Sequence, residues 1–145
     1  MRPVAIRFIV QATAEEFGLT YADLTGPRLG RHLTTPRQLA MLLAREARTD
    51  VSPRQIGDVL GGRDRTTIIH GINTAGALLS RRPDLRAARE RIVTRIKGEA
   101  DAAALDGRIL RAATVLDRLI ARRASLKHAA LSASIQSVVQ EVVAW

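Results

Sequence analysis

The run Gly61-Gly62-Arg63-Asp64-Arg65-Thr66-Thr67-Ile68-Ile69-His70 concentrates the residues of this chain that can recognise a ligand. The two glycines are expected to end one helix, and five polar side chains, Arg63 to Thr67, then fall in the first turn of the next. The later turns of that helix are apolar. A helix of this kind can place its amino end in the major groove of DNA while its body stays in a protein core.

The chain is strongly basic, and its positive charge is unevenly distributed. Lys and Arg total 23 against 14 Asp and Glu, which gives a net charge of +9. Residues 1–98 hold 17 basic and 9 acidic side chains, whereas residues 99–145 hold 6 and 5. Arginine dominates, and its planar guanidinium suits phosphates and guanine edges. The first segment is therefore predicted to face a polyanion, the alternative being the solvated surface of an arginine-rich chain.

The apolar periodicity predicts an all-α fold in which two helices form a helix-turn-helix. The expected elements are helices over 3–17, 36–48, 52–60, 64–80 and 83–98, a short turn capped by Thr20, and a loop over 25–34. Thr35-Pro36 and Ser52-Pro53 each give a capping residue followed by proline at the first helical position. Helices 52–60 and 64–80 have the proportions of a helix-turn-helix, although a packed hairpin shares this spacing. His70 is expected to pack on the underside of its helix.

A second domain, 99–145, is expected after the first domain, 1–98. Its apolar residues recur at spacings of four and three, as in a heptad pattern, and this register changes between Leu126 and Leu131. Two helices are therefore expected, over about 101–123 and 126–144. Their apolar stripes exceed what an isolated helix pair can hide. They are expected to fold back on the first domain, to dimerise, or to bind a partner protein.

Several classes of function lack their sequence signatures. The chain has no cysteine, no cluster of His, Asp and Glu with metal-ligand spacing, and no apolar run of the roughly 20 residues that span a bilayer. It also has no phosphate-binding loop of the Gly-x-x-x-x-Gly-Lys-Ser/Thr type and no nucleophile paired with a base. We therefore expect a non-enzymatic protein of the cytoplasm, without metal, cofactor, nucleotide or membrane.

Three segments together resemble a known family. They are Thr35-Pro36-Arg37-Gln38-Leu39-Ala40-Met41-Leu42-Leu43-Ala44-Arg45-Glu46, then Ile56-Gly57, then Gly61-Gly62-Arg63-Asp64-x-Thr66-Thr67-Ile68-x-His70. These segments closely resemble the C-terminal DNA-binding domain of the bacterial replication initiator DnaA, and the similarity extends loosely from Pro3 to Lys97. The resemblance implies a Trp-repressor-like helix-turn-helix bundle that binds double-stranded DNA. Here it would stand alone without the ATPase module and would be followed by a two-helix extension.

The resemblance also implies which side chains face DNA. The major-groove residues would be Arg63, Asp64, Arg65, Thr66 and Thr67. The arginines can bind guanine or phosphate, and the threonines can offer hydroxyls to phosphate and methyls to thymine. Asp64 can accept from a cytosine amine, and capping its own helix is an equal alternative. The family usually has His at position 65, so we expect a changed base preference.

Further DNA contacts are expected around this helix. A basic loop in the family reaches the minor groove, which implies that role for Arg28 or Arg31. The predicted phosphate contacts are Arg37, Arg45, Ser52 and Arg54. Asn73 and Thr74 replace basic residues of the family, so we expect a target that differs from the usual DnaA box.

The leading functional hypothesis is a transcription regulator. Residues 3–97 would recognise promoter DNA, and residues 100–145 would bind a second copy or a regulatory protein. Small proteins of this kind occur in phage and gene-transfer-agent clusters, which favours an activator. The alternatives are a replication modulator that competes with DnaA at origin boxes, and an interaction protein whose helix-turn-helix no longer binds DNA.

Overall fold

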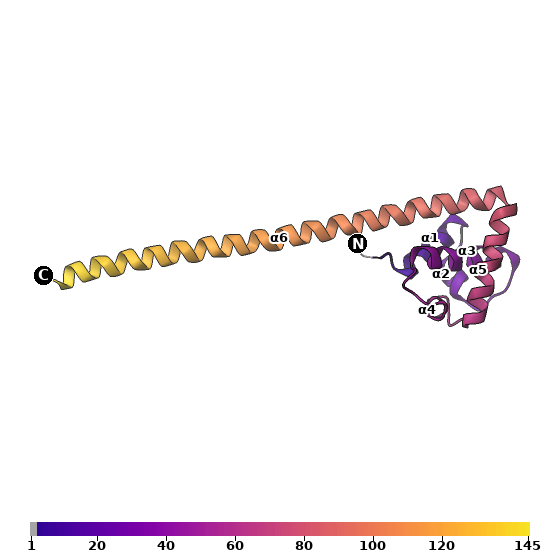
Figure 1. The fold of residues 1–145 in the computed structure, drawn as a ribbon, viewed down its shortest axis with the longest axis horizontal. Helices are drawn as coiled ribbons and strands as arrows, with labels where there is room; N and C mark the ends of the chain where they lie inside the picture. The colour runs from indigo at the N-terminus through magenta and orange to yellow at the C-terminus, as the bar shows by residue number, and fades with distance from the viewer. Residues whose placement is uncertain (1–2) are drawn as a thin grey trace. The chain divides into compact units, whose positions relative to one another are not determined.

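The computed structural model describes residues 3–145, which form six α-helices and no strand (Figure 1). The helices are α1 (Ile6–Glu16), α2 (Tyr21–Thr25), α3 (Arg31–Ala47), α4 (Pro53–Val59), α5 (Arg65–Arg81) and α6 (Pro83–Val143). The predicted all-α class is therefore confirmed. The chain divides into two compact units, Met1–Ala104 and Leu105–Trp145, with α6 contributing to both. Within the described part of the chain, no helix is apolar over a stretch long enough to cross a bilayer.

Helix α3 is the centre of the first unit and packs on α1, α2, α4 and α5. One buried cluster joins these five helices through residues such as Val10, Leu24, Ala40, Ile56 and Ile68. A second cluster lies where α1 and α3 meet the beginning of α6, and it contains Ile9, Leu39, Leu43, Leu85 and Ile92. Each of these large side chains contributes about 1.5–3 kcal/mol through burial. The two clusters therefore fix α3, and with it the helices that carry the candidate site.

The predicted start signals of α4 and α6 are confirmed. Ser52 caps α4 in a capping box, in which its hydroxyl accepts from the amide of Gln55 and the Gln55 side chain accepts from the amide of Ser52. Pro53 then occupies the first position of α4, and Pro83 is the first residue of α6. Thr20 caps α2 in the same reciprocal way with Asp23. Local sequence therefore determines where these three helices begin.

The predicted start of α3 at Thr35-Pro36 is wrong, because the helix begins at Arg31 and contains Pro36 in its interior. Leu33 is 2 % exposed and joins the core from the first turn of this helix. The Gly30 carbonyl accepts from the amides of Leu33 and Thr34, which closes that turn. The free energy gained by burying Leu33 offsets the cost of the one backbone hydrogen bond that Pro36 cannot donate. The loop before α3 is therefore shorter than expected.

The predicted division of the tail into two helices is also wrong. Helix α6 continues through Gly98 and through residues 124–130 to Val143. Gly98 is exposed, and an exposed glycine in a helix costs only about 1 kcal/mol relative to alanine. Residues 124–130 contain neither glycine nor proline and include three alanines. The change of apolar register near Leu126 is therefore a change of face along one helix and does not mark a turn.

Candidate nucleic-acid interface

A sharp turn at Gly61 and Gly62 joins α4 to α5. Both residues have left-handed backbone angles, with φ of 82° and 76°. The amides of Gly62 and Arg63 both donate to the Gly57 carbonyl at 3.0 Å, which closes the turn on α4. A β-carbon at Gly61 would lie 1.9 Å from the Thr25 carbonyl oxygen. Only glycine fits at position 61, so the helix-turn-helix geometry depends on it.

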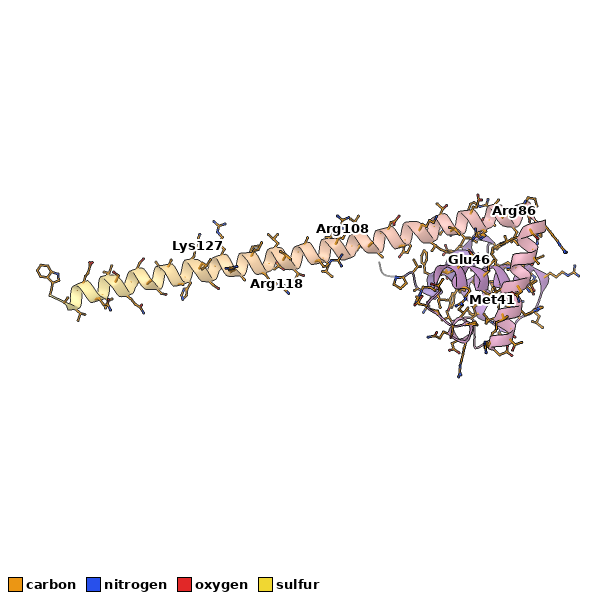
Figure 2. The ribbon with its side chains drawn as sticks, in the orientation of Figure 1. Met41, Glu46, Arg86, Arg108, Arg118 and Lys127 are labelled. Carbon is orange, nitrogen blue, oxygen red and sulfur yellow. The ribbon has the colours of Figure 1, made fainter. Side chains whose placement is uncertain are left out.

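Helix α5 is exposed at its first turn, and farther along it buries one face. Arg65, Thr66 and Thr67 are exposed, whereas Ile68 is fully buried. Farther along, Gly71 brings α5 close to α3, since a β-carbon there would lie 2.3 Å from the sulfur of Met41 (labelled in Figure 2). The first turn is thus presented to solvent by a helix whose body is held in the core. This confirms the distribution that the sequence predicts for a groove-reading helix.

Asp64 caps α5. Its carboxylate accepts from the Thr67 amide at 2.7 Å. This hydrogen bond, with others from the Thr67 side chain and the Thr66 amide, lowers the pKa of Asp64. The capping alternative is therefore confirmed, and the contact with a cytosine stays a prediction.

The structure contradicts the predicted base contact of Arg63. Its guanidinium donates to the carbonyls of Gly26, at 2.8 Å, and Thr25, at 3.3 Å, and also to that of Leu60. Burial lowers the pKa of Arg63. Because these bonds turn the guanidinium toward the protein, Arg63 binds the end of α2 to the turn before α5. It does not project with Arg65.

The predicted phosphate contact of Arg37 is wrong for the same reason. The side chain is 5 % exposed, and burial, together with the positive charge of Arg63, lowers its pKa. Its guanidinium donates to the carbonyls of Leu24, Asp23, Gly26 and Arg28, the shortest distance being 2.7 Å to Leu24. These are the carbonyls that α2 leaves free at its carboxyl end and in the following loop. Arg37 is therefore a structural residue.

Arg37 and Arg63 meet at one acceptor, the Gly26 carbonyl. We call these two arginines and the carbonyls they bind the arginine clamp. The clamp joins the loop before α3 to the turn before α5. It therefore fixes the position of the loop that carries Arg28 relative to the first turn of α5.

Arg28 lies in the loop between α2 and α3, and Arg31 lies where that loop ends. Both are exposed, and Leu29 between them is 87 % exposed. Arg28 stays on the loop, as predicted, but Arg31 is the first residue of α3. Their roles in the minor groove stay predictions, and the clamp holds the backbone of Arg28 in place.

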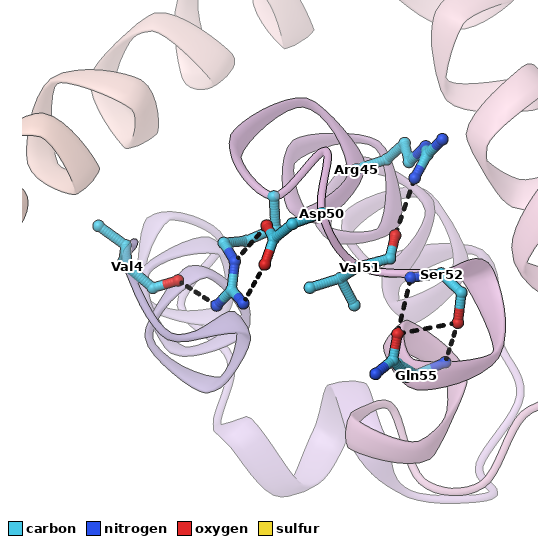
Figure 3. Close-up of polar contacts among 7 residues, drawn as sticks. Val4, Arg45, Asp50, Val51, Ser52 and Gln55 are labelled. Carbon is cyan, nitrogen blue, oxygen red and sulfur yellow. Dashed lines mark hydrogen bonds and ion pairs between the residues drawn. The ribbon is translucent and has the colours of Figure 1, made fainter. Parts of the chain in front are cut away.

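The remaining predicted phosphate contacts are Arg45, Ser52 and Arg54, and Figure 3 shows Arg45 and Ser52 around the start of α4. Arg45 donates to the Val51 carbonyl at 2.8 Å and is still exposed. The Ser52 hydroxyl serves the capping box with Gln55. Arg54 lies on the first turn of α4 and is exposed. Of these three, Arg54 retains the whole guanidinium for a phosphate, and the others already have a structural partner.

The ion pairs of the first unit leave this face positively charged. Three pairs join α6 to α1 or α3, and two are local, the five being Arg89–Glu46, Arg91–Glu16, Arg95–Glu15, Arg48–Asp50 and Arg82–Asp84. Within residues 3–145, no ion pair includes Arg28, Arg31, Arg54 or Arg65. Positive charge without a carboxylate partner therefore gathers near the amino ends of α3, α4 and α5, where an anion would be attracted.

Sequence reasoning missed the arginine clamp and misplaced His70. His70 is exposed on α5 and does not lie beneath it. Arg37 occupies the position four residues after Leu33 and four before Met41, both of which are buried. That helical spacing was the available signal that Arg37 lies on the buried face.

These features define a DNA-binding helix-turn-helix protein. Residues 6–74 match the family described as bacterial DnaA protein helix-turn-helix. The chain is also similar to the chromosomal replication initiator proteins DnaA of Neisseria meningitidis serogroup C and Neisseria gonorrhoeae, with 36% identity over 89 residues in each case. That alignment covers 61% of this chain and 17% of each relative. Residues 6–74 are thus a helix-turn-helix domain of the bacterial DnaA type.

Proposed function

We propose that this protein is a sequence-specific regulator that reads double-stranded DNA with the first turn of α5. The observation that carries the proposal is the exposure of Arg65, Thr66 and Thr67 on a helix whose next residue, Ile68, is fully buried. Arg65 can donate two hydrogen bonds to guanine, and the threonines can contact phosphate and thymine methyl groups. The family matched over residues 6–74 is a helix-turn-helix and supplies no catalytic role.

The surrounding arginines would position the domain on the duplex. Arg54 is proposed to contact phosphate beside the major groove, and Arg28 or Arg31 to enter the minor groove. Each lacks a carboxylate partner among the described residues. Phosphate contacts of this kind set register and orientation, while base contacts select the sequence.

Selection of bound duplexes from a random library tests the DNA-binding step. We expect one enriched motif, and a binding constant for it that falls steeply as salt rises, because each neutralised phosphate releases counterions. The Arg65→Ala variant should lose the enriched motif but keep much of the salt dependence. Binding without salt dependence, or no enrichment of any motif, would overturn the proposal.

We further propose transcription, most specifically activation at a promoter, as the regulated process. Arg65, Asn73 and Thr74 depart from the family pattern and favour a target other than origin boxes. The similarity to replication initiators favours the second candidate function, competition with DnaA at an origin. Genome-wide immunoprecipitation of the tagged protein separates the two, since enrichment at a promoter supports the first and enrichment at the origin supports the second.

Residues 100–145 are proposed to supply a protein-binding surface. Their large apolar side chains are exposed. An exposed apolar surface of this size is typical of a site that another molecule covers. A second copy and a regulatory protein are both compatible with the regulatory role. Removing these residues should leave binding to a single DNA site intact in either case.

A further inference from the structure

The loop between α2 and α3 carries the most exposed large apolar side chain of residues 3–104. Leu29 is 87 % exposed, whereas Ile69, the next in this range, is 39 % exposed. A single exposed leucine is ordinary on a protein surface, so exposure alone assigns it no role. What distinguishes Leu29 is the way in which the fold holds its backbone, together with the charges on either side of it.

The backbone on both sides of Leu29 is fixed by the rest of the domain. The Arg28 carbonyl, which belongs to the peptide bond that joins Arg28 to Leu29, accepts from the buried Arg37 guanidinium at 3.2 Å. The Gly30 carbonyl accepts from the Thr34 hydroxyl at 2.9 Å and from two backbone amides in the first turn of α3. The core therefore presents Leu29 on a preorganised loop, and a ligand that binds it orders little additional chain.

Two arginines flank Leu29 and keep their positive charge. Arg28 and Arg31 are exposed, and within residues 3–145 neither forms an ion pair. The remaining side chains of residues 25–32 are polar, glycine or proline, so Leu29 is a lone apolar group in a basic loop. The centre of a protein–protein interface instead consists of several apolar side chains and few charged ones. A leucine between arginines suits duplex DNA, in which stacked bases lie between two rows of phosphates.

The arginine clamp ties this loop to the recognition helix. Arg37 binds the carbonyls of Arg28 and Gly26, and Arg63, in the turn before α5, binds the same Gly26 oxygen. The loop and the first turn of α5 are therefore parts of one framework. When that turn lies in the major groove, as proposed above, the clamp fixes which stretch of the same duplex the loop meets.

We propose that Leu29 inserts between neighbouring base pairs from the minor groove and bends the bound DNA. This inference rests on the proposed function, because it adds a wedge to the loop whose arginines are proposed to enter that groove. Aliphatic wedges partly unstack one base step and kink the duplex by roughly 20–90° toward the major groove. The side chain of Leu29 leaves water on insertion, which offsets part of the cost of unstacking.

Insertion makes the base step at Leu29 part of the recognised sequence. Pyrimidine–purine steps such as TA and CA unstack more readily than stiff A-tract steps, so a wedge enters them more easily. We expect the selected DNA motif to contain such a step beside the bases that Arg65 reads. Replacing it by an A-tract step should weaken binding several-fold for the original protein and much less for Leu29→Ala. The loop thus selects a sequence without hydrogen bonds to its bases.

Measurement of DNA bending tests the wedge. The probe is the duplex motif selected from the random library, with a fluorophore at each end, so that energy transfer reports its end-to-end distance. The original chain should shorten this distance. Leu29→Ala should still bind the motif but lose most of the shortening, whereas Leu29→Met, which keeps a long apolar side chain, should retain it. Because Leu29 is exposed, the three proteins should have the same melting temperature.

A fluorescent base provides a local test of unstacking. 2-Aminopurine emits more strongly when it leaves the base stack, and it can replace each adenine of the motif in turn. One position should brighten when the original chain binds, and the same position should stay dim with Leu29→Ala. Brightening that is equal with both proteins would overturn the role of Leu29.

The outcomes separate this inference from the proposed function. A motif that is enriched and bound but stays straight would overturn the wedge and leave DNA recognition intact. Equal bending by the original protein and by Leu29→Ala would show that another part of the chain bends the DNA. If no duplex is enriched, the proposed function fails and the wedge fails with it.

Discussion

Arg63 and Arg65 stand two residues apart at the start of α5, yet they belong to regions with opposite roles. Arg63 lies in the arginine clamp, where its donors bind three backbone carbonyls. Arg65 lies on the exposed first turn. The difference shows that the identity of an arginine near a recognition helix does not decide its role. What decides it is whether carbonyls left free by another helix lie within reach.

The comparison separates two kinds of variant. One kind destabilises the domain, and the other lowers the affinity for DNA while the domain stays folded. The clamp should affect the free energy of unfolding, and the first turn of α5 should affect the affinity for DNA. Four expectations test this separation, beginning with the largest effect.

Arg37→Ala should lower the free energy of unfolding by roughly 3 kcal/mol, because it removes charged hydrogen bonds and leaves the buried Leu24 carbonyl and three partly buried carbonyls without this donor. Urea denaturation of the full chain measures this loss. The control is Arg31→Ala, an exposed residue whose replacement should change stability by less than about 0.5 kcal/mol. Equal urea midpoints for the two variants would show that the clamp is not needed for folding.

Gly61→Ala should destabilise the protein clearly more than Gly62→Ala. Both positions have left-handed backbone angles, for which a side chain costs about 1–2 kcal/mol. A β-carbon at Gly61 would also clash with the Thr25 carbonyl, whereas Gly62 faces open space. Thermal unfolding of the two variants compares these effects directly. Identical melting temperatures would mean that the turn moves away from α2 at little cost.

Arg65→Ala and Arg63→Ala should give opposite profiles. Loss of Arg65 should weaken binding to the selected motif by about 1–3 kcal/mol with an unchanged melting temperature. Loss of Arg63 should lower the melting temperature, while affinity measured well below that temperature stays closer to that of the original protein. Fluorescence anisotropy and thermal denaturation provide the two measurements. The reverse pattern would return the base contact to Arg63.

The smallest effect concerns pH. The folded-state pKa of Asp64 is lowered by hydrogen bonds from residues 66 and 67, so its stabilising charge is complete above its ordinary pKa and is lost as pH falls through the folded value. The stability advantage of the original protein over Asp64→Asn should therefore decline below about pH 4. The pKa values of Asp23, Asp50 and Asp84 are also lowered, but these groups are present in both proteins and cancel in the difference. A difference that is constant with pH would contradict this role of the Asp64 charge.

The elements that local signals specify could be predicted from the sequence, and those that depend on distant partners could not. The caps at Thr20, Ser52 and Asp64 and the glycine turn at 61–62 are local signals, and they suffice to locate the helix-turn-helix. The role of Arg37 depends on carbonyls of residues 23–28, whose positions only the folded chain determines. The continuity of α6 could not be predicted, because a change of apolar register along one helix has the same sequence pattern as a turn between two.

The shared acceptor at Gly26 has a consequence for the geometry of the DNA target. Arg37 and Arg63 both bind that oxygen, so the loop bearing Arg28 and the first turn of α5 cannot slide apart without breaking hydrogen bonds of both arginines. If the Arg28 loop and α5 contact DNA as proposed above, inserting one base pair between the two contacted segments would shift one segment by about 3.4 Å and rotate it by roughly 35°. On the proposed contacts, we therefore expect binding to tolerate a changed base better than a changed spacing between the two segments.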